Sequence, residues 1–128
     1  MVLVDTSAWI DADHRPDSPE SHELADLLDR DEVAITDMVL AELLQGASSA
    51  DHFRQLAEKL EAVHYLHAEQ ESWLRAAEMS YQLKRQGLTT PLSDLLIASV
   101  ALKAGIAVLA TDAHFARVPG LQLHQLPT

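Results

Sequence analysis

The sequence contains no cysteine, only two residues each of Trp, Tyr and Phe, and no long hydrophobic run. Without cysteine, disulfide bonds and thiolate metal sites are excluded, and a reducing, cytoplasmic compartment is the expected setting. No apolar stretch is long enough to cross a bilayer, because Lys103 interrupts the longest one. Met1 leads directly into an apolar segment with no basic flank, so we expect neither a signal peptide nor a membrane partner.

Basic residues are also scarce, since 9 lysines and arginines stand against 20 acidic residues and the formal net charge is −11. Proteins that attract nucleic acid by simple electrostatics are usually basic. The charge therefore counts against that kind of binding. It does not count against a nuclease whose acidic side chains hold metal ions, because bound divalent cations reverse the local field. An acidic protein could also bind a basic partner protein.

The length and composition predict a single domain over residues 1–128. A chain of this size can bury roughly two thirds of its unfolded surface. Hydrophobic residues make up 48% of the sequence and charged residues 23%, which is an ordinary globular balance. The protein can therefore fold around one hydrophobic core.

Short apolar runs alternate with amphipathic segments along the chain. Buried strands are predicted at 2–4, 33–35, 63–66 and 106–110, with an alternating edge strand at 121–126. Helices are predicted from Ser18-Pro19, over 38–45, around 53–60, around 73–86 with Trp73, Ala77 and Tyr81 on one face, and over 91–103. Residues 11–17 are predicted to form a loop near the mouth of a site. This order predicts an α/β sandwich with a mostly parallel sheet, whose sites form at the carboxyl ends of the strands.

Four carboxylates adjoin segments that should be buried. Asp5 follows the first strand, Asp112 follows the fourth, Asp94 opens an apolar helix, and Glu42 is the only charge in residues 38–44. An unpaired carboxylate in such a place is costly and tends to take up a proton. No Lys or Arg lies in these four segments. A single divalent cation bound by all four acids would offset the cost of burying their negative charges, and it is the simplest explanation for the four positions.

The magnitudes favour the same interpretation. Two carboxylates about 4 Å apart repel by roughly 4 kcal/mol at an effective dielectric constant near 20. Hard oxygen ligands favour Mg²⁺ or Mn²⁺ over Zn²⁺. One or two such ions at a sheet edge suit phosphodiester hydrolysis, because a metal lowers the pKa of bound water and stabilises charged oxygens. Taken singly, each acid could still be structural; Asp5 could simply end a strand, and Asp94 could be favoured by a helix dipole.

The segments around the four acids resemble the four motifs of PIN domains, in the order that the family has them. They are residues 4–10, 40–46, 92–98 and 109–115, and the length resembles that of VapC-type toxins. The resemblance implies a three-layer α/β/α fold with a mostly parallel sheet of four or five strands. It also implies a Mg²⁺ or Mn²⁺ site and endoribonuclease activity. Asp5, Glu42, Asp94 and Asp112 would then be the catalytic, metal-binding acids.

Further expectations follow from the resemblance alone. They are an RNA substrate, a cognate antitoxin whose tail covers the acidic groove, and a homodimer, as in a type II toxin–antitoxin system. Thr6 or Ser7 would form a hydrogen bond near the site. Many relatives have Thr or Ser two residues before the fourth acid, where Ala110 stands in this sequence. The role of the adjacent Thr111 is therefore open.

Two other functions remain open at this point. The chain could be a catalytically inactive binding module that holds a partner's arginine in its acid cluster. It could also be a metal-dependent nuclease or phosphatase with a substrate other than RNA. Outside the four motif acids, Glu23 is predicted to be solvated surface, and Trp9 and Trp73 are predicted to anchor the core or an interface. His114 closely follows Asp112 and is predicted to be a surface residue, with contact to RNA or to the residues around the metal-binding acids as the alternative.

Overall fold

The computed structural model, which describes residues 1–127, contains a single parallel sheet of four strands. The strands are β1 (Val2–Val4), β2 (Val33–Thr36), β3 (His64–Leu66) and β4 (Ala107–Leu109). Their order across the sheet is β3-β2-β1-β4, so the first strand lies in the middle. Val2 pairs with Val33 on one side and with Ala107 on the other. The predicted parallel sheet is therefore confirmed, and the carboxyl ends of β1 and β4 lie next to each other.

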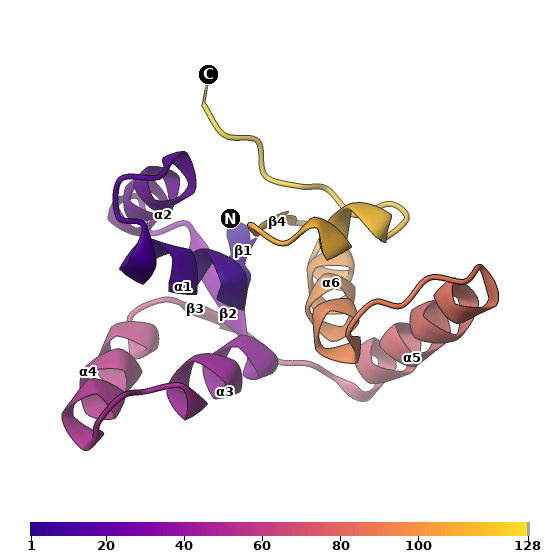
Figure 1. Ribbon diagram of the computed structural model, residues 1–128, viewed down its shortest axis with the longest axis horizontal. Helices are drawn as coiled ribbons and strands as arrows, with labels where there is room; N and C mark the ends of the chain where they lie inside the picture. Colours follow the sequence, from indigo (N-terminus) through magenta and orange to yellow (C-terminus); the bar gives the residue numbers. More distant parts are fainter. Residues whose placement is uncertain (128) are drawn as a thin grey trace.

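Within the described residues, six α-helices and one short 3-10 helix surround the sheet. The α-helices are α1 (Thr6–His14), α2 (Pro19–Asp29), α3 (Asp37–Gln45), α4 (Ala50–Glu61), α5 (Gln70–Arg85) and α6 (Leu92–Ala104), and the 3-10 helix is η1 (Ala113–Arg117). In Figure 1, α1 to α4 fill the left and lower parts of the view and α5 and α6 fill the right. This arrangement is the predicted three-layer α/β/α fold. No helix in residues 1–127 is long and apolar enough to cross a membrane.

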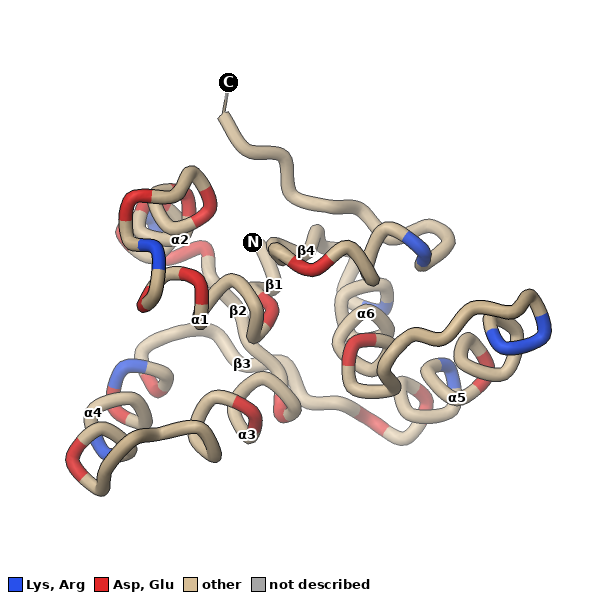
Figure 2. Tube along the Cα trace, in the orientation of Figure 1, with Lys and Arg blue, Asp and Glu red and all other residues tan. Residues whose placement is uncertain are grey.

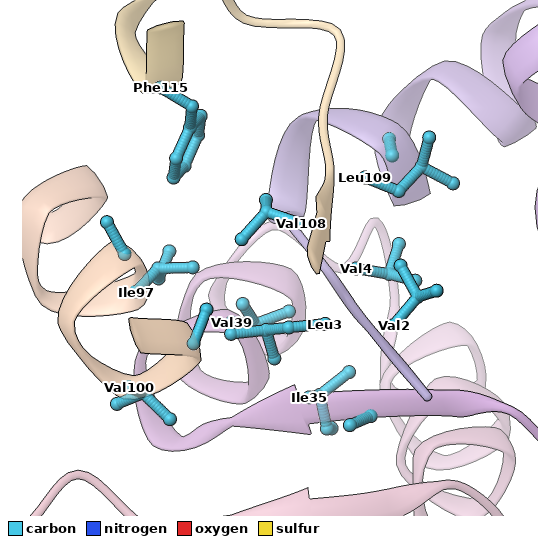
Figure 3. Packing of buried hydrophobic residues seen from close by; sticks show 14 of the residues in the cluster. Val2, Leu3, Val4, Ile35, Val39, Ile97, Val100, Val108, Leu109 and Phe115 are labelled. Carbon is cyan, nitrogen blue, oxygen red and sulfur yellow. The ribbon is translucent and has the colours of Figure 1, made fainter. Parts of the chain in front are cut away.

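The hydrophobic core takes side chains from β1, β2 and β4 and from all six α-helices, and α6 contributes its longest buried run. Residues 95–101 of α6 are all buried, because this helix packs against both α5 and β4. Figure 3 shows Ile97 and Val100 beside Leu3 of β1 and Val108 of β4. Burial of each such side chain contributes about 1.5–3 kcal/mol. The core thus fixes the start of α6, where Asp94 lies, relative to the ends of β1 and β4.

Helix α1 was not predicted, and residues 11–14 belong to it rather than to a loop. The helix begins because the carboxylate of Asp5 accepts a hydrogen bond from the backbone N–H of Ser7, which satisfies one of the free donors at the helix N-terminus. It ends at Arg15, where the following Pro16 disfavours helical backbone geometry. Only residues 15–18 connect α1 with α2.

The fifth strand predicted at 121–126 is not formed among the described residues. A single bridge joins Val108 to Leu123, with the N–H of Val108 donating to Gln122 and its C=O accepting from His124. Successive residues of a strand direct their backbone groups to opposite edges. A three-residue edge strand therefore offers only its middle residue to a further neighbour, which is too little to build another strand.

The buried face of α5 also differs from the prediction. Trp73 and Tyr81 are 47% and 58% exposed, whereas Ser72, Ala76 and Leu83 are buried against α6. Small residues at 72 and 76 let the two helices approach closely, and the large aromatic side chains are left outside. Trp9, in contrast, is 4% exposed and belongs to the core, as predicted.

Glu23 was predicted to be solvated but is only 5% exposed. The C-terminal segment crosses α2 at this point, and the imidazole Nε2 of His124 lies 2.6 Å from the Oε2 of Glu23. Arg30 approaches the other carboxylate oxygen at 3.8 Å. The pair joins two parts of the chain 101 residues apart, so it fastens the C-terminal segment over the edge of β4.

Replacing His124 with Ala should therefore destabilise the protein. The buried carboxylate of Glu23 would lose its closest partner, and an unsatisfied buried polar group costs about 1–3 kcal/mol. A His124→Gln variant keeps a donor near the same position and should lose less. Urea unfolding of the three proteins measures the difference, and equal stability of all three would contradict this role for the pair.

Candidate metal centre

Asp5 is brought to the carboxyl end of the sheet by β1. Its backbone N–H donates to the C=O of Leu109 at 2.9 Å, which ties the end of β1 to the end of β4. The residue is 3% exposed, and burial raises the pKa of its carboxyl to about 6. Hydrogen bonds from the hydroxyl and N–H of Ser7 oppose this rise, while the nearby charge of Asp94 adds to it. The folded protein therefore holds this carboxylate in an unfavourable environment.

Asp94 and Asp112 meet at the same edge, with His114 between them. The Nδ1 atom of His114 lies 3.0 Å from Asp94 Oδ2 and 2.9 Å from Asp112 Oδ1. One ligand atom from each of the three residues lies within 4.8 Å of the other two. Burial raises the pKa of Asp94 and the charge of Asp112 raises it further, while the hydrogen bond from His114 lowers it. The prediction of a surface residue is therefore wrong for His114, and the alternative, a residue in contact with the acids of the site, agrees with these distances.

Glu42 stands apart from this group of three. It lies on α3, and its Oε1 atom accepts a hydrogen bond from the Thr6 hydroxyl at 2.9 Å. Thr6 directly follows Asp5 in the chain, so the contact between α1 and α3 brings Glu42 toward the buried carboxylate. The predicted hydrogen bond of Thr6 near the acids is present, and its acceptor is Glu42.

Ser7 connects the first and fourth motifs. Its hydroxyl donates to Asp5 Oδ2 at 2.6 Å and accepts from the backbone N–H of Thr111 at 3.1 Å. The Thr111 residue is exposed, and its contact with the site is through the backbone. The contact with Ser7 thus uses the backbone amide of Thr111, which any residue except proline would supply. Having Thr at 111 rather than at 110 therefore does not disturb this hydrogen bond.

These acids have no lysine or arginine partner among the ion pairs of residues 1–127; His114 alone pairs with Asp94 and Asp112. The Oδ1 atom of Asp5 is buried and accepts no hydrogen bond from residues 1–127. In Figure 2 the acidic segments after β1 and β4 and at the start of α6 lie around the centre of the view, whereas most basic segments lie toward its edge. An unsatisfied carboxylate oxygen of Asp5 near Asp94, which in turn lies close to Asp112, gives a donor set that fits a divalent cation.

A pocket borders Glu42 on the side of α1, α3 and α4. It is lined by apolar side chains together with Asp13, His14 and Lys59; the apolar residues are Trp9, Ile10, Leu43 and Leu56. The ammonium group of Lys59 lies 5.6 Å from the centre of the Trp9 ring, within the range of a cation–π interaction. The acidic edge therefore continues into a partly apolar surface.

Comparisons with known proteins cover almost the whole chain. The family model of the PIN domain matches residues 2–121. The VapC ribonuclease Mb1587 of Mycobacterium bovis is 29% identical over 129 residues, which cover 95% of this chain and 96% of that protein. Ribonuclease VapC18 of Mycobacterium tuberculosis is 31% identical over 126 residues, covering 94% and 89% of the two chains.

Two solved structures show the same fold. A chain of VapBC2 from Rickettsia felis, solved with a DNA fragment from its promoter, is 25% identical with a TM-score of 0.77, covering 99% of this chain and 100% of that one. A chain of the DNA-bound VapBC from Salmonella typhimurium is 20% identical with a TM-score of 0.80, covering 97% and 98%.

Proposed function

Because the chain belongs to the PIN-domain family, we propose that it is a metal-dependent endoribonuclease and the toxin of a type II toxin–antitoxin pair. The observation that carries the proposal is the convergence of Asp5, Asp94 and Asp112 at one sheet edge, where a buried carboxylate oxygen has no hydrogen-bond partner in the described part of the chain. The choice of RNA as substrate is supported by the curated relatives, which are named VapC ribonucleases. The cytoplasm, where RNA is abundant, is the proposed place of action.

The proposed function gives each side chain of the site a separate role. Asp5, Asp94 and Asp112 would hold one or two divalent ions, Mg²⁺ or Mn²⁺, with Glu42 as a further acid on the α3 side. Such an ion, when bound, makes water more acidic and stabilises negative charge on phosphate oxygens. Ser7 fixes Asp5 by donating to Oδ2, and Asp112 is fixed because it caps η1 through the N–H of His114. No Ser, His or Lys nucleophile is required.

Electrostatics make the cation necessary for substrate binding as well. The chain has a formal net charge of −11, and the site itself gathers several carboxylates. An RNA phosphate would be repelled from this edge unless the local charge were reversed by a divalent ion. The burial of Asp5 strengthens these interactions, because charges interact more strongly where water is excluded.

We predict that purified protein cleaves RNA with Mg²⁺ or Mn²⁺ and that EDTA abolishes the cleavage. An Asp112→Asn variant should be inactive, because Asn can still cap η1 but does not supply a carboxylate. Asp29→Asn, which alters an exposed acid at the end of α2, is the matched control and should stay active. Gel analysis of labelled RNA gives the readout. Cleavage by Asp112→Asn at the wild-type rate would contradict the proposal.

The same assay decides between the alternatives. Single-stranded DNA, duplex DNA and a small phosphoester are compared with RNA under identical metal concentrations. Preferential turnover of one of these would assign the chain to a nuclease or phosphatase with a different substrate. Metal binding without turnover of any substrate would assign it to a binding module.

We also propose an antitoxin partner and a homodimer. Several solved structures with this fold are described as toxin–antitoxin or VapBC complexes, which supports the first of these. The pocket beside Glu42 offers apolar side chains together with Asp13 and Lys59, a surface suited to an amphipathic segment of an antitoxin. The exposed Trp73 and Tyr81 of α5 are apolar surface available for self-association. Size-exclusion chromatography with light scattering, with and without the coexpressed antitoxin, tests both.

A further inference from the structure

The imidazole of His114 is placed where a metal ligand would be. Its Nδ1 atom lies within 3.0 Å of a carboxylate oxygen of Asp94 and within 2.9 Å of one of Asp112, so this nitrogen belongs to the group of ligand atoms. We propose that His114 coordinates the metal directly, and that the site therefore prefers a first-row transition ion such as Mn²⁺ to Mg²⁺. The inference rests on the metal-dependent function proposed above and specifies its ion.

The backbone holds this ring at the site. The N–H of His114 donates to Asp112 Oδ1 at 2.9 Å, as the first turn of η1 requires. The next residue, Phe115, is 1% exposed and points into the core, where Figure 3 shows it above Ile97. Because Asp112, two residues before it, and Phe115, directly after it, are both fixed, the imidazole needs no rearrangement of η1 to stay beside the two carboxylates.

A second observation independently calls for a cation at this edge. Asp5 is buried beside Asp94, and its Oδ1 atom accepts no hydrogen bond from any described residue. An imidazole beside Asp94 and Asp112 leaves that oxygen unsatisfied, so His114 acting only as a counter-charge does not complete the site. A metal ion held by Asp94, Asp112 and His114 would be attracted toward the remaining carboxylate.

The chemistry of the donors then determines the preferred ion. Mg²⁺ is a hard cation that favours oxygen ligands and keeps much of its water. Imidazole nitrogen is a softer donor that suits transition ions, while carboxylates also accept Mn²⁺. The prediction of Mg²⁺ from the sequence assumed four oxygen ligands, and a nitrogen ligand changes that balance toward Mn²⁺.

Calorimetric titration of the full-length protein with Mn²⁺ and with Mg²⁺ tests the preference. Wild-type protein should bind Mn²⁺ more tightly than Mg²⁺. His114→Gln removes a direct ligand and should weaken Mn²⁺ binding by about 100-fold or more, beyond the 10- to 100-fold loss typical of a residue that only supports a ligand, and Mg²⁺ binding less. His67→Gln is the matched control, because His67 is a largely exposed histidine beside a different carboxylate, Asp37, at 3.4 Å. If His114 were only a counter-charge, its removal would leave Mn²⁺ affinity unchanged or raise it, and the proposal would be overturned.

Pulsed electron paramagnetic resonance of the Mn²⁺-loaded wild-type protein tests coordination without any variant. We expect ¹⁴N coupling from a bound imidazole, retained in His67→Gln and lost in His114→Gln. Mn²⁺ bound without nitrogen coupling would overturn the role of His114, while metal-dependent RNA cleavage by the same sample would leave the proposed function standing. Failure of both ions to bind would overturn both.

Discussion

Replacing Asp5 with Asn is expected to make the metal-free protein more stable at pH 8 while abolishing the metal-dependent cleavage of RNA that we propose. Burial raises the pKa of this carboxyl from 3.8 to about 6, so the folded state disfavours the charged form. A pKa difference of that size corresponds to a loss of at most about 3 kcal/mol in the free energy of unfolding when the carboxyl is charged. Asn retains an oxygen that can accept from Ser7 and is an equally good helix cap, so α1 should be preserved.

The sign of the effect defines its pH dependence. A carboxyl whose pKa is higher in the folded state contributes stability below pH 3.8, and this contribution is lost as the pH rises toward 6. The free energy of unfolding of Asp5→Asn should therefore exceed that of wild type by less at pH 5 than at pH 8. Above about pH 6.5 the difference should be constant. Urea unfolding in EDTA measures it, with Asp29→Asn as an exposed control that should change stability little.

Addition of Mn²⁺ should make wild type more stable than Asp5→Asn, the reverse of their order in EDTA. A ligand that binds only the folded state stabilises it by an amount that grows with the logarithm of the ligand concentration relative to Kd, so wild type should gain stability while Asp5→Asn gains much less. An Asp5→Asn protein that is less stable than wild type in EDTA at pH 8 would contradict the interpretation of Asp5 as a destabilising carboxylate. The predicted pattern is the usual conflict between function and stability, in which a site keeps groups that only its ligand can satisfy.

Much of this site could be predicted from the sequence because its acids are tied to local patterns. Asp5 and Asp112 directly follow apolar runs that became β1 and β4, and Asp94 opens an apolar helix that became α6. In a parallel sheet the carboxyl ends of neighbouring strands share one edge, so their convergence follows from topology. Glu42 was found because a single charge in an apolar helix is conspicuous, although its observed contact is with Thr6.

The features that sequence reasoning missed depend on contacts with no local pattern. The position of His114 is set by the capping turn at Asp112, which brings a ring back toward Asp94. The burial of Glu23 depends on His124, which is 101 residues away. Similarly, the buried face of α5 is selected by how closely α6 approaches it, so the small residue Ala76 faces inward and Trp73 does not.

The relative positions of Asp94 and Glu42 predict unequal effects of their removal. Asp94 belongs to the group of three whose ligand atoms lie within 4.8 Å of one another, whereas Glu42 is held by Thr6. Loss of a residue that only supports a metal ligand commonly costs 10- to 100-fold in affinity or activity. Asp94→Asn should therefore reduce RNA cleavage by about 100-fold or more, and Glu42→Gln by about tenfold.

Metal titration separates the two roles further. Asp94→Asn should abolish detectable Mn²⁺ binding in calorimetry, while Glu42→Gln should retain it with reduced affinity. A double variant should then be no worse than Asp94→Asn alone, because once the ion is lost there is nothing left for Glu42 to stabilise. If Glu42→Gln instead removed metal binding as completely as Asp94→Asn, the ion would have to lie between β1 and α3, and the grouping of Asp94 with Asp112 and His114 would not be the primary metal site.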